Sequence, residues 1–274
     1  MEKNKKVIDQ MGREVTFAFP LRKIVSVVPS QTELLVDLGM EENLVGITKF
    51  CVHPLGLKNK KTIVGGTKTL DIQKIIDLKP DIVFANKEEN TQAQIEELQA
   101  VLPVWLSDIV TIDDALKMIL DIGICCDKEL EANILCNDFM LKNKKLQSFF
   151  QANFKGKTVA YFIWRKPYMV AASGTYIDEM LKNLGFRNIF SENIRYPVVS
   201  VENPAEINPD FVFLSSEPFP FKEKHLAEFQ NIFPEATVKI VDGEMFSWHG
   251  SRMLKALDYF EKSLLSLAKV ELIG

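Results

Sequence analysis

The chain has 274 residues, which at about 150 residues per domain is long enough for two domains. Hydrophobic residues make up 47% and charged residues 26%, so the composition is that of a globular protein and excludes a disordered or collagen-like chain. The formal net charge is only −4, with 33 basic and 37 acidic residues spread along the sequence. This balance provides no strong field for nucleic acid or an anionic membrane, and we expect neither as a partner.

Targeting signals and cysteine motifs are not evident in the sequence. No stretch approaches the roughly 18 apolar residues that a membrane-spanning helix needs, and no apolar segment follows the basic residues 3–6, so no secretory signal is visible. The four cysteines show no C-x-x-C spacing, which excludes a zinc ribbon and a thioredoxin-like motif. Buried free thiols are the interpretation that this pattern favours.

Short β-branched segments alternate with amphipathic ones, which predicts an α/β protein with largely parallel sheets. Residues 7–17 predict a hairpin with its turn near Gly12. The strands expected after it, in chain order, are residues 23–28, 44–48, 81–85, 103–106, 158–164, 211–215 and 238–241.

Two helix starts carry recognisable capping signals. Residues Ser30 to Glu33 read S-Q-T-E, which predicts a capping box, and the helix that follows is expected to end at Gly39. Thr175 is expected to open a similar helix that ends at Gly185.

The two halves of the chain look like copies of one plan. Residues 78–84 (LKPDIVF) are similar to residues 207–213 (INPDFVF), and in each case a proline ends a short helix before a buried strand. Between the halves, residues 127–153 contain neither proline nor glycine and carry apolar residues mostly at steps of three to five. This pattern predicts one long helix rather than a coiled coil, because no heptad register is kept.

The expected domains are therefore an N-terminal α/β lobe over 1–126, a bridging helix over 127–154 and a C-terminal α/β lobe over 155–274. No G-x-G-x-x-G, phosphate-binding loop, G-x-S-x-G or H-E-x-x-H motif occurs in the chain. The sequence consequently favours binding over catalysis.

Several segments in this order and spacing are similar to one family. They are residues 22–30, 32–35, 38–39, 45–46, 64–66, 78–81, the long helix and 185–188. Together they resemble the class III substrate-binding proteins of ABC importers, which serve vitamin B12, ferric siderophores and haem, and most closely the vitamin B12-binding members.

This resemblance implies two Rossmann-like three-layer α/β/α lobes bridged by one long rigid helix. It implies a monomeric, non-enzymatic receptor that holds a metal chelate (cobalamin, haem or a ferric siderophore) in a cleft between the lobes. No intrinsic cofactor is expected. The resemblance also implies delivery of the ligand to an ABC permease and a periplasmic or membrane-anchored location. Because no signal peptide is visible in the sequence, a cytoplasmic location stays open as an alternative.

In this family an acidic residue on each lobe docks onto arginines of the permease. The matching positions are Glu202, seven residues before Pro209, and Gln73, seven residues before Pro80. Gln73 is not acidic, and this departure from the pattern allows a soluble relative that feeds no importer.

Ligand contacts are expected in loops where strands lead into helices, on the facing edges of the two lobes. Flat aromatic faces suit a corrin, a porphyrin or a catecholate, and arginine suits carboxylate groups. The candidates are Pro29, Ser30, Phe50, Cys51, His53 and Thr67 in the first lobe, and Trp164, Arg165, Tyr168, Phe246, Trp248, His249 and Arg252 in the second.

Cys51, His53 and His249 are weak candidates for ligands of a soft transition metal or a haem iron. His225 lies in a charged run and is expected to be solvated, whereas Trp105 is expected in the core. Two alternatives to an importer receptor stay open at this point. One is a cytosolic carrier or sensor of a metal or tetrapyrrole, and the other is a metal-dependent enzyme on the same scaffold.

Overall fold

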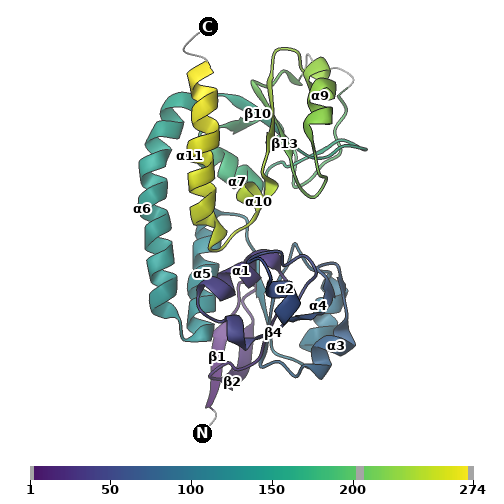
Figure 1. Cartoon of the computed structure of the whole chain (residues 1–274), viewed down its shortest axis with the longest axis vertical. Helices are drawn as coiled ribbons and strands as arrows, with labels where there is room; N and C mark the ends of the chain where they lie inside the picture. Colours follow the sequence, from purple (N-terminus) through teal and green to yellow (C-terminus); the bar gives the residue numbers. More distant parts are fainter. Residues whose placement is uncertain (1–2, 202–206, 271–274) are drawn as a thin grey trace. The chain divides into compact units, whose positions relative to one another are not determined.

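The computed structural model describes residues 3–201 and 207–270, and contacts between residues divide these into two compact units. The N-terminal unit holds the described residues within 1–109, 113–138 and 249–252 (Figure 1). The C-terminal unit holds those within 110–112, 139–248 and 253–274. Among the described residues, no helix is both long and apolar enough to cross a membrane.

The N-terminal unit is built on a five-stranded sheet whose order is β5-β4-β3-β8-β9 and whose pairings are all parallel. Its strands are β3 (Ile24–Ser26), β4 (Leu44–Ile47), β5 (Thr62–Ile63), β8 (Ile82–Asn86) and β9 (Val104–Ser107). Two antiparallel pairs accompany the sheet, namely β1 (Lys3–Ile8) with β2 (Glu14–Phe19), and β6 (Gly65–Gly66) with β7 (Thr69–Leu70). The predicted hairpin and the four predicted strands of this half are confirmed.

The helices of this unit are α1 (Pro29–Asp37), the 3₁₀ turn η1 (Glu41–Asn43), α2 (Leu57–Lys60), α3 (Ile72–Asp77), α4 (Gln92–Gln99) and α5 (Ile112–Cys126). One apolar core joins the sheet to α3 and α4. Side chains from alternate strand positions, such as Val83 and Ala85, pack against Ile75 of α3 and Leu98 of α4. A parallel sheet covered in this way reads as continuous apolar segments, which is why its strands were predictable.

The start of α1 differs from the predicted capping box. The helix begins at Pro29, which occupies its first turn, and the residue before it, Val28, makes no side-chain cap. Ser30 and Glu33 therefore lie inside the helix, and both side chains face other partners. The end of the helix agrees with the prediction, because Gly39 adopts a positive φ of 82°.

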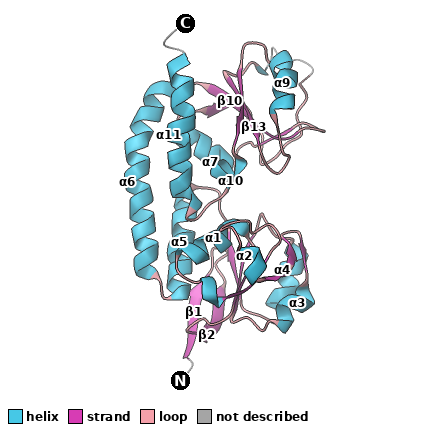
Figure 2. Cartoon of the chain, viewed as in Figure 1, coloured by secondary structure: helices cyan, strands magenta, loops and turns pink. Residues whose placement is uncertain are grey.

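The C-terminal unit carries a mixed sheet of order β11-β10-β13-β14, with β12 also paired to β10 (Figure 2). Its strands are β10 (Thr158–Trp164), β11 (Met169–Val170), β12 (Arg187–Asn188), β13 (Phe211–Ser215) and β14 (Thr237–Val241). Only β11 pairs antiparallel with its neighbour. The three predicted strands of this half are confirmed.

The helices of the C-terminal unit are α7 (Tyr176–Asn183), the 3₁₀ turn η2 (Glu223–His225), α9 (Leu226–Ile232), α10 (Gly243–Ser247) and α11 (Arg252–Val270). Thr175 caps α7 by accepting a hydrogen bond from the Asp178 amide at 3.2 Å, as predicted. The core here is largely aromatic: Phe162 of β10 contacts Phe229 of α9, with ring centroids 4.9 Å apart.

One long helix belongs to both units. Helix α6 (Glu129–Phe154) contributes its residues up to Asp138 to the N-terminal unit and those from Phe139 to the C-terminal unit. Asp127 lies between α5 and α6 and has a left-handed backbone conformation with a φ of 59°, which ends α5. The sequence predicted α6 almost to the residue but did not identify α5.

The aspartate of the repeated Pro-Asp segment accepts hydrogen bonds at the start of a neighbouring strand in each unit. The Asp81 carboxylate accepts hydrogen bonds from the backbone amides of Arg22 and Lys23 at 2.7 and 2.8 Å, beside the start of β3. The Asp210 carboxylate accepts from the backbone amide and the hydroxyl of Thr158, both at 2.7 Å, at the start of β10. The internal similarity seen in the sequence therefore corresponds to one structural device used twice.

Candidate functional site

In each unit the loops at the carboxyl ends of the parallel strands lie along one edge of the sheet, where α/β proteins commonly bind ligands. In the N-terminal unit these loops follow β3, β4, β8 and β9, and in the C-terminal unit they follow β10, β13 and β14. All predicted ligand residues except His249 and Arg252 come from these loops, from the first turns of the helices that follow, or from the short elements beside them.

The predicted residues of the N-terminal unit differ widely in exposure. The ring of Phe50 is 50% exposed, with the Lys49 ammonium 5.2 Å from its centroid. His53 is half-buried in the same loop, whereas Pro29, Ser30 and Thr67 are buried. Phe50 and His53 are therefore the side chains of this group that are accessible to a ligand.

Cys51 is fully buried and is held by two hydroxyl groups. Its Sγ lies 3.2 Å from Oγ1 of Thr32 and 3.3 Å from Oγ1 of Thr48. Burial raises the pKa of the Cys51 thiol and outweighs the opposing effect of these hydrogen bonds. A thiol kept protonated in this way is a poor metal ligand, because metals bind the thiolate.

A buried amide network supports the same edge, and sequence reasoning missed it. The Gln31 amide of α1 donates to Oγ of Ser107 at 2.6 Å, and the Asn86 amide donates to the same oxygen at 2.9 Å. The Asn90 amide donates to the backbone carbonyls of Val27 and Thr67 at 3.2 and 3.0 Å. A polar residue directly after an apolar strand, as at Asn86, was the signal available in the sequence.

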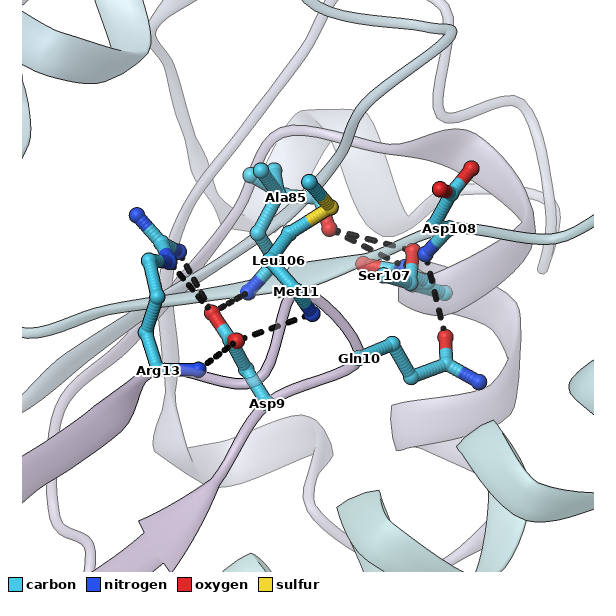
Figure 3. A network of polar contacts seen from close by, with 9 residues as sticks. Asp9, Gln10, Met11, Arg13, Ala85, Leu106, Ser107 and Asp108 are labelled. Carbon is cyan, nitrogen blue, oxygen red and sulfur yellow. Dashed lines mark hydrogen bonds and ion pairs between the residues drawn. The ribbon is translucent and has the colours of Figure 1, made fainter.

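A cavity of about 340 Å³ adjoins this network, between the β1–β2 turn, β9 and α4. Ile95 and Leu106 contribute apolar surface to it, and Arg13 and Lys87 contribute positive charge. Each cation already forms an ion pair, Arg13 with Asp9 at 2.5 Å and Lys87 with Asp108 at 2.6 Å. The cavity is therefore a weak binding site for an anion. Figure 3 shows how Asp9 also accepts from the amides of Met11 and Leu106, which fixes the turn against β9.

The segment His249–Arg252, predicted as part of the second lobe's site, belongs by its contacts to the N-terminal unit. The Arg252 guanidinium forms a buried two-point ion pair with Glu33 of α1 at 2.7 and 2.8 Å. Nδ1 of His249 lies 3.4 Å from Oγ of Ser30, and burial lowers the pKa of His249 to about 4. These side chains hold α1, and their ion pair and burial leave them little freedom to contact a ligand.

The first cluster of the C-terminal unit follows β10. Trp164 is 39% exposed, and its indole N–H donates to the Lys166 carbonyl at 3.2 Å. Arg165 and Tyr168 both bond to the Glu228 carboxylate of α9, at 2.8 and 2.6 Å. Burial, followed by the hydrogen bond to Glu228, raises the pKa of Tyr168 to about 12. The carboxylate thus fixes a cation and a phenol beside an accessible indole.

A second cluster follows β13 and β14. Oε1 of Glu217 accepts from the Trp248 indole at 3.1 Å and from the Ser247 hydroxyl at 2.9 Å, so the half-buried Trp248 has a fixed orientation. Phe246 is completely buried and contacts Tyr161 and Phe260, with ring centroids 5.1 and 4.7 Å away. Trp248 is therefore available to a ligand, whereas Phe246 serves the core.

The other predicted positions are placed as follows. Gln73 is exposed on α3 and donates to Asp77 at 2.8 Å. Glu202 lies outside the described residues. Trp105 is buried, as predicted, whereas the expectation that His225 is solvated is wrong. His225 is only 5% exposed because it caps η2 and packs against Phe219 and Phe221.

The structure brings no metal-binding group together within 3–201 and 207–270: no cluster of three or more His, Cys, Asp or Glu side chains is found there. All four cysteines are buried and free of disulfides, as predicted.

Known proteins with a similar sequence or a similar fold include several ligand-binding proteins. The chain is 24% identical over 258 residues to a vitamin B12-binding protein of Pectobacterium carotovorum subsp. carotovorum, and the match covers 92% of this chain and 91% of the relative. The crystal structure of the periplasmic vitamin B12-binding protein of Vibrio cholerae superposes with a TM-score of 0.78 at 22% identity, covering 91% of this chain and 98% of that one. An apo periplasmic haem-binding protein from Roseiflexus sp. RS-1 gives a TM-score of 0.75 at 17% identity, covering 90% of this chain and 99% of that one.

Two α/β units that share one continuous long helix define the helical-backbone class of solute-binding proteins. The model of the periplasmic binding protein family matches residues 24–236, and the chain belongs to this family. It is accordingly a solute-binding protein and not an enzyme, and the alternative of a metal-dependent enzyme is set aside.

Proposed function

We propose that this chain binds a metal chelate that carries flat ring surfaces, such as cobalamin, haem or a catecholate-type ferric siderophore, and delivers it to an ABC permease outside the cytoplasm. The observation that carries this proposal is the pair of oriented indoles at the carboxyl edge of the C-terminal sheet. Trp164 is held by the Lys166 carbonyl, and Trp248 is held by Glu217. An oriented aromatic face loses little conformational entropy when it stacks on a ring system.

The charged neighbours suit the peripheral groups of such a ligand. Arg165 is 31% exposed although it is paired with Glu228, so part of its guanidinium remains accessible to a carboxylate on the ligand. In the N-terminal unit, Phe50 and His53 offer a further aromatic ring and an imidazole on the strand-end loops. The bound metal would be part of the ligand, so the proposal requires no metal site built from side chains of this chain.

The relatives support this choice of ligand. The similar proteins include one named for vitamin B12 and one named for haem, and each of these ligands is a metal chelate built on a large ring. The exposed Gln73 and the acidic Glu202 are the proposed permease contacts, of which only Glu202 carries charge.

The test is a binding titration of the full chain with cobalamin, cobinamide, haem and ferric siderophores, with free Fe³⁺ and Co²⁺ as separate arms. A ligand at about 100 times its dissociation constant should stabilise the protein by roughly 2.7 kcal/mol, which is a thermal shift of several degrees. We expect one class of chelate to shift the melting temperature and the free metals to leave it unchanged.

Two variants locate the site. Trp164→Leu and Trp248→Leu should each weaken binding about fivefold, since a stacked aromatic contributes on the order of 1 kcal/mol. Phe149→Leu is the matched control, because Phe149 is a half-buried aromatic in the last turns of α6, which lead into the amino end of β10, and Trp164 lies at the carboxyl end of that strand. Equal affinity in all three variants, or a response to free metal alone, would contradict the proposal.

A further inference from the structure

A buried histidine closes the turn that leads into α9. His225 is 5% exposed and is the last residue of the 3₁₀ turn η2. Its backbone N–H donates to the Lys222 carbonyl at 2.8 Å, and the Lys222 backbone N–H donates to Nδ1 of the imidazole at 2.9 Å. Because a backbone amide can only donate, Nδ1 carries no proton, and the imidazole is neutral in this arrangement.

The imidazole also supports the accessible Trp164 indole through one intervening ring. The ring centroids of His225 and Phe219 are 5.5 Å apart, and Phe219 contacts Trp164 edge-on with centroids 5.7 Å apart. Phe221 completes the cluster, with its centroid 5.6 Å from His225 and 4.7 Å from Phe219. The Trp164 indole therefore rests on an aromatic cluster that contains His225.

The same turn sets the start of α9, because η2 continues directly into this helix. Glu228 lies in the first turn of α9. Its carboxylate accepts from the Arg165 guanidinium at 2.8 Å and from the Tyr168 hydroxyl at 2.6 Å. The cation and the phenol beside the indole thus depend, through this carboxylate, on the turn that His225 closes.

Protonation of the imidazole removes the hydrogen bond that closes the turn. An imidazolium carries a proton on both ring nitrogens, so Nδ1 would present a donor to the backbone N–H of Lys222, which is also a donor. The new charge would in addition be buried, and a buried charge without a partner is costly. The η2 turn is therefore stable in its present form only while His225 is neutral.

The charges around His225 oppose its protonation. Those that act on the imidazole are the cations Lys224 of η2 and Arg165 after β10 and the anion Glu228 of α9, and the exposed Lys222 and Glu223 lie on the same turn. Burial, followed by the charge of Lys224 and then that of Arg165, lowers the pKa of His225 from its ordinary value of 6.5. The imidazole is consequently neutral at pH 7 and gains its proton in mild acid.

We propose that His225 is a positioning residue of the ligand platform formed by Trp164, Arg165 and Tyr168, and that its protonation loosens this platform and weakens ligand binding. The neutral imidazole keeps the turn closed, which holds the indole, the guanidinium and the phenol in place together. The imidazolium opens the turn, and all three groups lose a common support. This inference rests on the proposed function, because it concerns the same strand-end site, and it adds a dependence on pH to that site.

The first test needs no ligand. In ¹H–¹⁵N NMR spectra of the full chain the three tryptophans give three indole signals, and the variant Trp164→Phe assigns one of them. We expect the Trp164 signal to shift between pH 8 and pH 4.5 with the same midpoint as the imidazole signals of His225. His225→Asn keeps an acceptor near the position of Nδ1 but cannot gain a proton, so the Trp164 signal should stay in place in this variant. The buried Trp105 indole of the N-terminal unit is the internal reference.

The second test measures affinity, with cobalamin, cobinamide, haem and ferric siderophores as probes. Dissociation constants are measured for the parent chain and for His225→Asn at the same pH values, so that their ratio cancels any ionisation of the ligand itself. We expect the ratio to be constant from pH 8 to about pH 6.5. Below this range the parent chain should lose affinity relative to the variant, by up to about tenfold per pH unit, because one proton is linked to binding.

Lys224 supplies a matched variant, since its side chain is exposed on η2 and its charge lowers the pKa of His225. Lys224→Glu should move the midpoints of both pH profiles upward and leave the affinity at pH 8 unchanged. A Trp164 signal that moves equally in the parent chain and in His225→Asn, or an affinity ratio that stays constant to pH 4.5, would overturn the inference. If no chelate binds while the Trp164 signal follows His225, the proposed function fails and the positioning role of His225 is supported.

Discussion

The two units treat the two ends of their sheets differently. At the amino ends they are alike, since Asp81 and Asp210 each hold the start of a neighbouring strand through hydrogen bonds of 2.7 to 2.8 Å. At the carboxyl ends they diverge. The N-terminal unit has a buried network of amides and hydroxyls around Ser107. The C-terminal unit has the Trp248 indole fixed by Glu217, and a guanidinium and a phenol fixed by Glu228. The repeated plan therefore supplies the scaffold, and the two units differ in the polar and aromatic groups at the carboxyl ends of their strands.

The difference extends to buried charge. In the N-terminal unit, Glu33 and Arg252 are paired with only 3% and 5% of their side chains exposed. In the C-terminal unit, the Arg165–Glu228 pair is 31% and 24% exposed. A buried pair is costly to break because the remaining partner keeps its charge without hydration, whereas an exposed partner is rehydrated.

The largest effect should follow from removal of Arg252. Arg252→Leu is expected to destabilise the protein by about 3–5 kcal/mol, because the buried Glu33 carboxylate loses the guanidinium that compensates its charge. The double variant Glu33→Leu/Arg252→Leu should recover much of this loss. Thermal denaturation of the three proteins checks the prediction, and equal destabilisation of the single and double variants would show that buried charge is not the cause.

The next effect concerns pH. Because burial lowers the pKa of His249 to about 4 from an unfolded value near 6.5, the unfolded chain binds this proton more readily than the folded one. Stability should therefore be constant above about pH 6.5 and fall as the pH decreases toward 4, by about 3 kcal/mol in total from this group. His249→Gln should lack this component. Denaturant unfolding at pH 7 and pH 4.5 measures it, and parallel losses in both proteins would refute the assignment.

The smallest expected effect on stability tests whether Asp81 and Asp210 have equivalent roles at the amino ends of the strands of the two sheets. Asp81→Ala and Asp210→Ala should each cost about 1 kcal/mol, since each removes one partly exposed carboxylate that accepts two hydrogen bonds. Burial by itself would raise the pKa of Asp210, but the bonds from Thr158 and the charge of Lys157 lower it. Its contribution should thus persist at neutral pH and disappear as the pH falls through the lowered value. Strongly unequal losses of stability in the two variants at pH 7 would contradict the view that Asp81 and Asp210 have equivalent roles.

Much of the fold could be predicted from the sequence, because strands buried on both faces produce short apolar segments and α6 has a sustained helical pattern. The site was less accessible. Ser30 and Glu33 have the spacing of a capping box, yet their partners are His249 and Arg252, which lie 219 residues away in the sequence. No local pattern reports such a pairing, and the amide network around Ser107 likewise depends on contacts 21 to 76 residues apart.

The ion pair between Glu33 and Arg252 also bears on the order in which the chain can fold. Domains generally fold as units during synthesis, amino-terminal first. Here the N-terminal unit includes residues 249–252, so the carboxylate of Glu33 lacks this partner until nearly the whole chain has left the ribosome. A fragment ending at residue 138 would contain every strand of the five-stranded N-terminal sheet and still lack the cation that pairs with Glu33. The N-terminal unit therefore cannot complete its own contacts before residue 252 has been synthesised.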